Sequence, residues 1–382
     1  MHVAWVPAWY PSADAPLNGV FFEEQIQMLR AVGITTNVIA VDSASAWQID
    51  KFTTTCDRDE GVIRTTVPLV PMGIVPGDRA LIERQMRRIA RLYEDTFGVP
   101  DVLHAQSVFP AVIAAAWLGR HWGIPWGLTE HRSTSVQRNP QSFRYRAIAP
   151  AVRNAAFRCA VSPRFAQKLS RYYDAPFSCY RLPVPDEYFA APGTPDPDHF
   201  TFLHISTLER RKQVEETIAA LAELYPDYPH ARLVVVGGGE DRINELRALA
   251  DEHGVGSAVE FLGPRSRDEI PALVRQADCF ILVSTIESNG VVYAEALAAG
   301  VPIIGADSWG GSYATTPDVG ILVPMRNHEA LVGAMREMLD PAARTERFPA
   351  EQLQRVARAR YSPQVFASVM TRLYSEAIAN HR

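Results

Sequence analysis

The sequence predicts an α/β protein made of two doubly wound, Rossmann-like domains that face a cleft. Strand-like apolar runs alternate with amphipathic helix-like runs along both halves of the 382-residue chain, as in βαβ units and parallel sheets. This length exceeds one ordinary domain. A Pro- and Gly-rich segment without periodicity separates the halves. We therefore expect domains at 1–190 and 200–360, joined by a linker at 191–199, with a cleft between their facing strand ends.

Individual elements follow from the apolar runs. The strands expected in the first half are His2–Pro7, Thr36–Val41, Val102–Ala105, Trp126–Thr129, Cys159–Val161 and Tyr180–Val184. Those expected in the second half are Phe202–Ser206, Leu233–Val236, Glu260–Leu262, Cys279–Val283, Pro302–Gly305 and Ile321–Val323. A helix pattern at Ser362–Ile378 predicts a C-terminal helix within 361–382, which can pack back on the N-terminal domain.

Composition favours a cytoplasmic globular protein. The chain is 47% hydrophobic and 21% charged, and no run approaches the roughly 18 apolar residues of a membrane span. The first residues lack the basic and apolar pattern of a secretory signal. Four scattered cysteines without metal-ligand spacing predict reduced, mostly buried thiols and no structural metal.

Charge is unevenly distributed along the chain. Residues 131–173 contain no acid but nine basic side chains, Arg132, Arg138, Arg144, Arg146, Arg153, Arg158, Arg164, Lys168 and Arg171, in a chain of net charge −5. This stretch indicates a surface for an anionic partner, although a scatter of solvated arginines is the alternative. The acidic remainder and the lack of interleaved aromatic platforms argue against nucleic acid.

A second basic segment, Ile82–Tyr93, has the pattern of an amphipathic helix with four arginines. Such a helix can lie on an anionic membrane, which would place the protein peripherally at the inner face of the membrane. An ordinary amphipathic helix explains the same pattern.

Two acids stand out in the second half. Glu295 is the only charged residue in the run 288–304, where a carboxylate is expected to be buried and therefore paired. Glu287 precedes it by eight positions, just after the apolar run Cys279–Val283. We expect a strand, then a helix over 290–299 closed by Gly300 and Pro302. Glu287 then lies in the strand-to-helix loop, at the edge of a parallel sheet where ligands bind. The alternative is one loop acid and one buried structural acid.

Cations and glycines accompany these acids at other expected strand ends. Arg210, Arg211 and Lys212 precede a helix that begins near Val214, where they oppose the helix dipole and so indicate an anion site. Gly237 begins a glycine turn after Leu233–Val236, which allows close backbone approach or is a plain tight turn. The expected helix start at Gly290 can bind phosphate. Together these features describe a pocket for a nucleotide joined to a polyol.

The segment Glu287-Ser288-Asn289-Gly290-Val291-Val292-Tyr293-Ala294-Glu295 resembles the E-x7-E signature of retaining GT-B glycosyltransferases of family 4. Further similarities follow the family's order along the whole chain. They are Trp9–Ser12 with Pro16–Gln25, Asp101–Ala105, Thr129–His131, Val161-Ser162, Leu182-Pro183, Trp309–Ser312 and Val319–Pro324. The resemblance implies transfer of a hexose-type sugar from a UDP- or GDP-sugar to an acceptor, with the anomeric configuration retained.

The resemblance also implies roles for the donor-binding residues. Glu295 would hold the ribose hydroxyls and Glu287 the donor sugar, and Asn289 would be a further contact with the donor. Lys212, with Arg210 or Arg211, would neutralise the leaving diphosphate.

Other implied contacts lie at glycines and in the first half. The amides near Gly290 and Val291 would add to the binding of the diphosphate. Gly19 would let its loop approach the phosphates, and His131 would lie over the sugar.

Three departures from the family pattern concern residues that would bind the donor. Ser206-Thr207 stands where Gly-Arg is usual, Asn289 replaces a common Phe, and Pro183-Val184-Pro185 replaces Pro-Asn-Gly. The phosphate-binding arginine must then come from Arg210 or Arg211.

The implied chemistry needs neither metal nor other cofactor, because fixed cations and a helix N-terminus can stabilise the departing diphosphate. We assign no nucleophile. The acceptor, a glycan or lipid-linked molecule of cell-surface polysaccharide synthesis, is expected at the N-terminal domain. The alternatives are a nucleotide-sugar epimerase of the same fold and a non-catalytic two-lobed sugar-binding protein.

Overall fold

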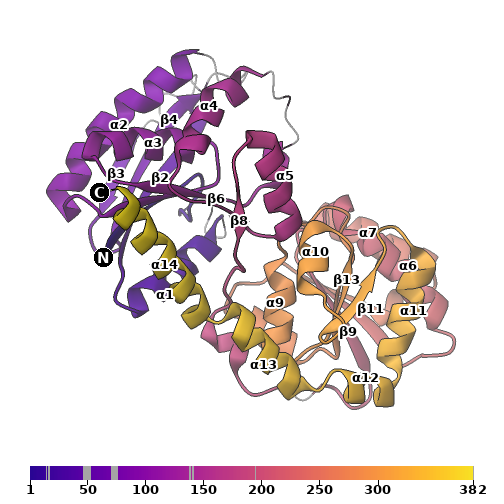
Figure 1. Ribbon diagram of the computed structural model, residues 1–382. Helices are drawn as coiled ribbons and strands as arrows, with labels where there is room; N and C mark the ends of the chain where they lie inside the picture. Colours follow the sequence, from indigo (N-terminus) through magenta and orange to yellow (C-terminus); the bar gives the residue numbers. More distant parts are fainter. Residues whose placement is uncertain are drawn as a thin grey trace. The chain divides into compact units, whose positions relative to one another are not determined.

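The structure, a computed structural model, describes residues 1–13, 15, 18–45, 53–69, 76–136, 139, 142–193 and 195–381. The chain divides into two compact units. Unit 1 consists of Met1–Tyr180 and Phe366–Arg382, and unit 2 is Arg181–Val365. Both ends of the chain therefore belong to unit 1 (Figure 1).

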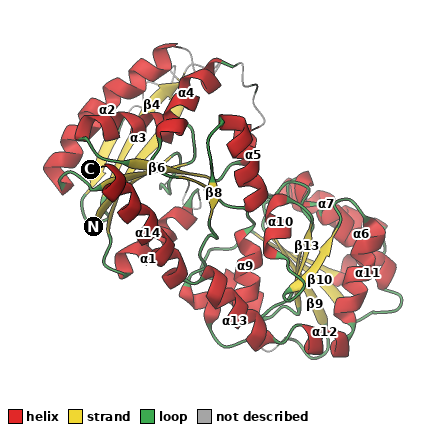
Figure 2. Ribbon diagram, viewed as in Figure 1, coloured by secondary structure: helices red, strands yellow, loops and turns green. Residues whose placement is uncertain are grey.

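Unit 1 is a sheet with helices on its faces (Figure 2). Its elements in chain order are β1 (His2–Pro7), α1 (Val20–Ala31), β2 (Thr35–Ser45), β3 (Thr54–Asp57), β4 (Val62–Leu69), α2 (Pro76–Phe97), β5 (Val102–Gln106), α3 (Ala111–Trp122), β6 (Trp126–Glu130), the 3-10 turn η2 (Ser133–Val136), α4 (Phe143–Asn154), β7 (Arg158–Ala160), α5 (Pro163–Tyr173), β8 (Ser178–Cys179) and most of α14 (Pro363–His381).

The unit 1 sheet has eight strands in the order β3-β4-β2-β1-β5-β6-β7-β8. Only β3 runs antiparallel, against β4. Strand order reverses between β1 and β5, which pair in parallel from Val3 opposite Val102 to Pro7 opposite Gln106. Such a reversal leaves a crevice outside the carboxyl ends of the two strands, where open α/β sheets bind ligands.

Unit 2 is a second α/β domain with a smaller sheet. Its elements are η3 (Asp186–Phe189), β9 (Phe200–Ile205), η4 (Arg210–Lys212), α6 (Val214–Leu224), β10 (Ala231–Val236), α7 (Glu240–Glu252), η5 (Gly256–Ala258), β11 (Val259–Gly263), α8 (Ile270–Arg275), β12 (Cys279–Leu282), α9 (Val291–Ala298), β13 (Ile303–Ala306), α10 (Trp309–Ala314), β14 (Gly320–Val323), α11 (His328–Leu339), α12 (Pro341–Arg347) and α13 (Ala350–Tyr361).

All six strands of the unit 2 sheet are parallel, in the order β11-β10-β9-β12-β13-β14. Counted from the first strand of the unit, this is the doubly wound order 3-2-1-4-5-6. One helical layer contains α6 with α7 and α11, which both contact it, and another contains α9 with α8, α10 and α13, which all contact it. The order reverses between β9 and β12, so the loops after these two strands meet at one crevice.

The observed elements confirm the expected two-domain parallel α/β class and correct several details. Tyr180–Val184 is not a strand: β8 ends at Cys179, and the segment Arg181–Pro185 is irregular. Pro183 and Pro185 offer no amide hydrogen for a sheet ladder, and the amide of Val184 donates to the carbonyl of Tyr361. The hairpin strands β3 and β4 were not expected.

The Pro- and Gly-rich segment expected as the interdomain linker lies inside unit 2, apart from residue 194, which is outside the described residues. The chain passes between the units at Tyr180–Arg181 instead of near residue 190. Tyr188 and Phe189, which precede the segment, are buried in the core of unit 2. A Cβ on Gly193 would lie 2.0 Å from the carbonyl oxygen of Arg275, so this backbone packs tightly on unit 2.

Helix α14 is fixed to unit 1 by a buried polar network. Trp5 Nε1 donates to the Tyr374 hydroxyl at 3.0 Å, and that hydroxyl lies 2.8 Å from His104 Nδ1. The other ring nitrogen of His104 lies 2.8 Å from the hydroxyl of Thr129. Burial lowers the pKa of His104 to about 3, helped by the neighbouring His131. The ring is therefore neutral at pH 7 and can both donate and accept, which suits these two hydroxyl partners.

Two further findings concern membranes and thiols. Among the described residues, no helix is both long enough and apolar enough to cross a bilayer. All four cysteines are free, and only Cys159 and Cys279 are buried, because Cys56 is exposed and Cys179 is partly exposed.

Removing the hydroxyl group of Tyr374 tests the network. Tyr374→Phe leaves Trp5 Nε1 and His104 Nδ1 without this partner in the core, so we expect a loss of about 1–3 kcal/mol in the free energy of unfolding, measured by urea denaturation. Tyr225→Phe, on unit 2, is the control, because its hydroxyl takes no part in the network. Equal effects of the two substitutions would contradict the assignment.

Candidate active site

The reversal of strand order in unit 2 brings together the two loops that carry the acids and cations singled out in the sequence. The loop after β9 contains Lys212, and the loop after β12 contains Glu287. The two loops are joined by a backbone hydrogen bond from the Thr285 amide to the Arg211 carbonyl at 2.9 Å. This edge of the sheet is therefore the candidate donor site.

Lys212 and Glu287 form the closest charged contact at this edge. Lys212 Nζ lies 2.6 Å from Glu287 Oε2, and the two side chains are only 11% and 14% exposed. The pairing offsets the cost of removing both charges from water. A cation and an anion held this close at a strand-order reversal can address both the phosphate and the hydroxyl groups of one ligand.

The two arginines beside Lys212 point to different partners. Arg211 Nη1 donates to the Ile286 carbonyl at 3.2 Å, next to Glu287, and Arg211 also pairs with Glu209. Arg210 is 78% exposed and pairs with Glu245 of α7 at 2.6 Å. Of the two, Arg211 is thus the one held against the Glu287 loop.

Glu295 is buried in α9 and paired, as its apolar surroundings predict. Its side chain is 1% exposed, and its Oε1 lies 2.8 Å from Arg267 Nη1. Arg267 belongs to the loop between β11 and α8, at the same edge of the sheet. The sequence analysis did not identify this arginine.

The start of α9 is shaped by Gly290, which adopts left-handed backbone angles at the helix N-cap. A Cβ at this position would lie 2.6 Å from the ring of Tyr293. The helix proper begins at Val291, where amide hydrogens have no partner within the helix. Asn289 packs by its backbone against Gly310 of α10, whose amide donates to the Glu287 carbonyl at 2.8 Å.

Gly237 supports the loop after β9. Its φ is +107°, and a Cβ there would lie 1.9 Å from the Ser206 carbonyl oxygen. Ser206 in turn accepts the Leu208 amide through its hydroxyl at 3.0 Å. Ser206, which stands where the family has glycine, therefore helps to shape the loop that leads to Lys212.

Arg242 also shapes this loop, although the sequence analysis did not single it out. Its Nε donates to the Leu208 carbonyl at 2.9 Å, and Leu208 has a left-handed φ of 55°. Arg242 is 16% exposed and pairs with Glu215 and Glu245. Its isolated position on a polar helix gave no sequence signal. Arg267 could have been suspected, since it lies in a loop after a predicted strand.

In unit 1, His131 follows β6 and lies among aromatic rings. Its ring centroid is 5.6 Å from that of Phe21 and 5.1 Å from that of Phe22. The ring Nε2 lies 2.9 Å from Gln106 Oε1, an acceptor, so it carries the proton. Burial and the neighbouring Arg132 lower the pKa of His131 to about 3, so the ring is neutral at pH 7.

Gly19 lies on the α1 side of unit 1. It has a left-handed φ of +83°, and a Cβ there would lie 2.8 Å from the Trp9 side chain. Packing against Trp9 therefore requires a glycine here irrespective of any ligand. Residues 14, 16 and 17 of the expected glycine loop lie outside the described residues, as do Arg138 and the neighbouring residues 137, 140 and 141 of the polar loop after His131.

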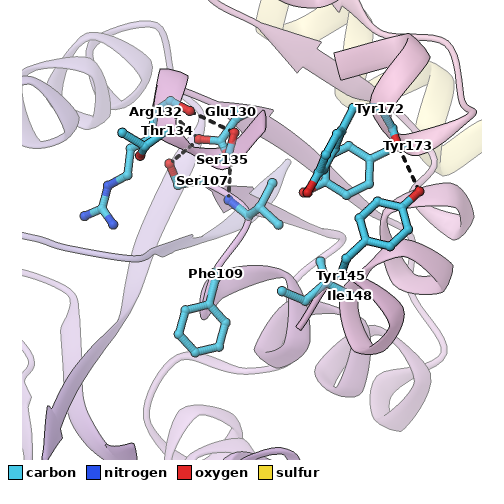
Figure 3. A pocket seen from close by; sticks show the side chains of 11 residues that line it. Ser107, Phe109, Glu130, Arg132, Thr134, Ser135, Tyr145, Ile148, Tyr172 and Tyr173 are labelled. Carbon is cyan, nitrogen blue, oxygen red and sulfur yellow. Dashed lines mark hydrogen bonds between the residues drawn. The ribbon is translucent and has the colours of Figure 1, made fainter. Parts of the chain in front are cut away.

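A pocket opens beside His131 at the carboxyl ends of β5 and β6 (Figure 3). Its volume is about 70 Å³, room for roughly five waters at ~15 Å³ each. On one side lie Tyr145, Tyr172 and Tyr173 from α4 and α5, and on the other lie hydroxyl groups and Glu130. Aromatic faces opposite polar groups suit a ligand that has one apolar and one hydroxylated face.

Glu130 organises the polar side of the pocket. Its carboxylate accepts the hydroxyl of Ser107 at 2.8 Å and the amides of Val108, His131 and Arg132 at 2.9, 2.7 and 2.7 Å. Burial raises its pKa against these hydrogen bonds, which lower it. Ser107 has a left-handed φ of 72°, the kind of backbone strain that a surrounding network must hold in place.

The basic helix expected as a membrane contact is α2, and its apolar side chains are in the core. Ile82, Met86 and Ile89 are fully buried, whereas Arg84, Arg87, Arg88 and Arg91 are exposed. The helix therefore cannot insert its apolar face into a bilayer. Any contact with an anionic surface through α2 would be electrostatic.

Metal ligands do not gather in the part of the chain that the structure describes. No group of three or more His, Cys, Asp or Glu side chains there could hold an ion.

Two family descriptions match the chain, one for each unit. Residues 19–181 match the glycosyl transferase 4-like domain, and residues 187–353 match glycosyl transferases group 1. The chain belongs to the GT-B glycosyltransferases of the family 4 type.

Curated relatives agree with this family. The putative teichuronic acid biosynthesis glycosyltransferase TuaC of Bacillus subtilis is 27% identical over 358 residues, 88% of each chain. The D-inositol 3-phosphate glycosyltransferase of Corynebacterium jeikeium is 28% identical over 241 residues, 55% of this chain and 57% of that protein. The chain thus matches little more than half of the latter.

Solved structures confirm the GT-B fold. Anabaena HepE in complex with UDP has a TM-score of 0.74 at 17% identity, covering 98% of this chain and 100% of that one. Sucrose-phosphate synthase from Thermosynechococcus elongatus has a TM-score of 0.70 at 19% identity, with both chains fully covered.

Gly237 and Gly239 provide a matched pair for testing how the loop after β9 is supported. Gly237→Ala forces a Cβ into the Ser206 carbonyl, whereas Gly239 has no neighbour within 4 Å of its Cβ position and a φ of −98°. We expect Gly237→Ala to cost more than about 2 kcal/mol in the free energy of unfolding and Gly239→Ala about 1 kcal/mol or less, because alanine is a poorer N-cap of α7 than glycine. Urea denaturation measures both, and similar losses would show that the close approach is unimportant.

Proposed function

We propose that the protein is a retaining, metal-independent glycosyltransferase that moves a hexose-type sugar from a UDP- or GDP-sugar to a hydroxyl group of a glycan or lipid-linked acceptor. The observation that carries this proposal is the Lys212–Glu287 pair, 2.6 Å apart at the strand-order reversal of unit 2. Glu295 lies buried in the helix that follows Glu287.

Charge at this edge suits a nucleoside diphosphate as the leaving group. Negative charge grows on the diphosphate as the bond to the anomeric carbon breaks, and fixed cations and helix amides stabilise it without reorganisation. Lys212, Arg211 and the amides at the start of α9 provide these groups. Arg210 is the less suitable arginine, because it is 78% exposed and directed to Glu245 of α7, whereas Arg211 donates to the Ile286 carbonyl next to Glu287.

Carboxylates suit the hydroxyl groups of the same donor. A carboxylate can accept two hydrogen bonds from vicinal hydroxyls, as an acid does for ribose in dinucleotide-binding folds. We assign this role to Glu295 and contact with the donor sugar to Glu287. Asn289, beside Glu287, is a further donor contact in this proposal.

His131 contributes a neutral ring in unit 1. Because its pKa is lowered to about 3 and Nε2 donates to Gln106, the ring can accept a hydrogen bond from a sugar hydroxyl through Nδ1 without adding charge, and we assign it to the donor sugar. The attacking group is the acceptor hydroxyl, and the departing phosphate can take its proton, so no protein base is required.

Similar proteins support the choice of donor and acceptor. HepE, which has the same fold, was solved with UDP and with UDP-glucose, which supports a nucleotide-sugar donor. The relative named for teichuronic acid biosynthesis supports a role in cell-surface polysaccharide synthesis. The acid-free, basic stretch 131–173 of unit 1 suits an acceptor that bears phosphate or another anionic group.

We assign the acceptor to the pocket beside His131. The tyrosine rings suit the apolar face of a sugar ring, and Thr134 and Ser135 lie at the same opening (Figure 3).

Calorimetric titration of the whole protein with UDP, GDP and ADP tests the proposal, followed by incubation with the matching sugar nucleotide. Selective binding of one nucleotide and acceptor-dependent turnover are expected, and NMR of the product should show the donor's anomeric configuration. Turnover without an acceptor would favour the epimerase. Absence of binding to any nucleotide would overturn the proposal.

Lys212 and Glu287 can be tested together. Lys212→Gln removes a charge-assisted contact with the diphosphate and leaves the Glu287 carboxylate to repel that diphosphate. The Kd for the nucleotide should therefore rise by about tenfold or more. Adding Glu287→Gln should restore part of the affinity, because the repelling carboxylate is gone. No recovery in the double variant would mean that Lys212 acts without reference to Glu287.

Acceptor binding is tested at Tyr172. Tyr172→Ala should raise the KM for the acceptor by roughly 3- to 10-fold, the value of one aromatic packing contact, and leave the Kd for the nucleotide unchanged. Tyr225→Ala, a similarly half-buried tyrosine in unit 2, should leave the acceptor KM as it is. An unchanged acceptor KM in Tyr172→Ala would exclude this pocket as the acceptor site.

A further inference from the structure

We propose that Arg267 is a positioning residue of the donor site. It holds the Glu295 carboxylate in the orientation that binds the ribose hydroxyls, and so determines how strongly the protein requires a ribose. The inference rests on the proposed function, since it gives a second residue to the site assigned there to the nucleotide.

The first observation is the asymmetry of the ion pair. Glu295 is 1% exposed and Arg267 is 28% exposed, with 2.8 Å between Oε1 and Nη1. The carboxylate is therefore enclosed by the protein, while the guanidinium reaches it from the surface. An enclosed carboxylate without such a partner would be driven to protonate or to turn away. The planar guanidinium constrains direction as well as charge.

The second observation is that the loop carrying Arg267 is held locally. Glu269 Oε2 accepts the Ser266 amide at 2.9 Å and the Ser266 hydroxyl at 2.6 Å. The Glu269 amide donates back to the Ser266 carbonyl at 3.1 Å. These reciprocal hydrogen bonds fix the turn on both sides of Arg267, so its direction towards α9 does not depend on the ion pair alone.

A third contact limits where the guanidinium can move. Arg267 Cζ lies 5.8 Å from the ring centroid of Tyr188, within the range of a cation–π attraction. Tyr188 is itself 1% exposed, so it is a fixed wall. Arg267 is thus held between a rigid aromatic ring and a buried carboxylate.

The Arg267–Glu295 pair lies at the part of the sheet where the nucleoside half of a donor is expected. The loop follows β11, on the β9 side of the strand-order reversal. The Gly237 amide, in the neighbouring loop after β10, donates to the Gly263 carbonyl at 2.8 Å. Lys212 and Glu287 lie at the reversal itself, so the diphosphate and the ribose have separate charged partners within one unit.

The test compares the binding of UDP with that of 2′,3′-dideoxy-UDP in full-length variants, or the corresponding GDP pair if wild type prefers guanosine. Wild type should favour the ribose form by about 10- to 100-fold, the value of one or two hydrogen bonds to a charged group. In Arg267→Gln this preference should fall below about 3-fold, with weaker UDP binding. Arg267→Lys keeps the positive charge but lacks the planar guanidinium. Its ribose preference should lie between those of wild type and Arg267→Gln.

Arg360→Gln is the matched control. Arg360 is also in unit 2, is 27% exposed and pairs with an acid, Asp318, at 3.2 Å. Its removal should leave both affinities unchanged. Arg267→Gln with unchanged ribose preference would overturn the inference. Tighter UDP binding in that variant would do so too, since Arg267 would then be occupying the place of the ligand.

A double variant tests whether Arg267 acts through Glu295 or contacts the nucleotide directly. This variant can be measured even if Arg267→Gln alone does not fold. With Glu295→Gln the enclosed charge is gone, so adding Arg267→Gln should change the UDP Kd by less than about 2-fold. A further tenfold loss would show that Arg267 contacts the nucleotide itself, against the proposal. If wild type binds no nucleotide, the proposed function fails. If wild type prefers ribose and Arg267→Gln does too, only this inference fails.

Discussion

Pairing of enclosed charge is the constraint on which the carboxyl edge of the unit 2 sheet depends. Glu287 and Lys212 share one contact, Glu295 and Arg267 share another, and Arg242 joins α7 to the loop after β9. Each contact links two segments that are far apart in the sequence. The interactions that neutralise these charges therefore also set the loop shapes, so the edge is both a binding surface and a structural joint.

Pairing also changes how the cations should be regarded. A run of three basic residues suggests a positive surface, but in the folded protein each has an acidic neighbour: Arg210 has Glu245, Arg211 has Glu209 and Lys212 has Glu287. A diphosphate must compete with these acids. Such a site favours ligands that bring hydroxyl groups for the carboxylates together with phosphate for the cations, and it discriminates against phosphate alone.

Local patterns predicted much of this fold. Apolar runs located most strands of both sheets to within a few residues, because buried parallel strands leave a strong signal, but they missed β3, β4 and β8. The burial of Glu295 followed from its neighbours. Its partner could not be predicted, since the 28 positions between Arg267 and Glu295 are bridged only by tertiary structure. The domain boundary was misplaced for a related reason: proline and glycine mark irregular backbone, and irregular backbone can pack on a domain as well as join two.

Unit 2 is an uninterrupted stretch of chain, whereas unit 1 is assembled from both ends of the sequence. Unit 2, which we propose binds the donor, is thus inserted between β8 and Phe366, near the start of α14. A continuous insertion can be exchanged as a cassette between relatives by replacing one segment. Exchange of unit 1 requires two replacements at once, and the second must preserve Tyr374, which completes the hydrogen bonds of Trp5 and His104. This asymmetry makes unit 2 the simpler of the two to transplant.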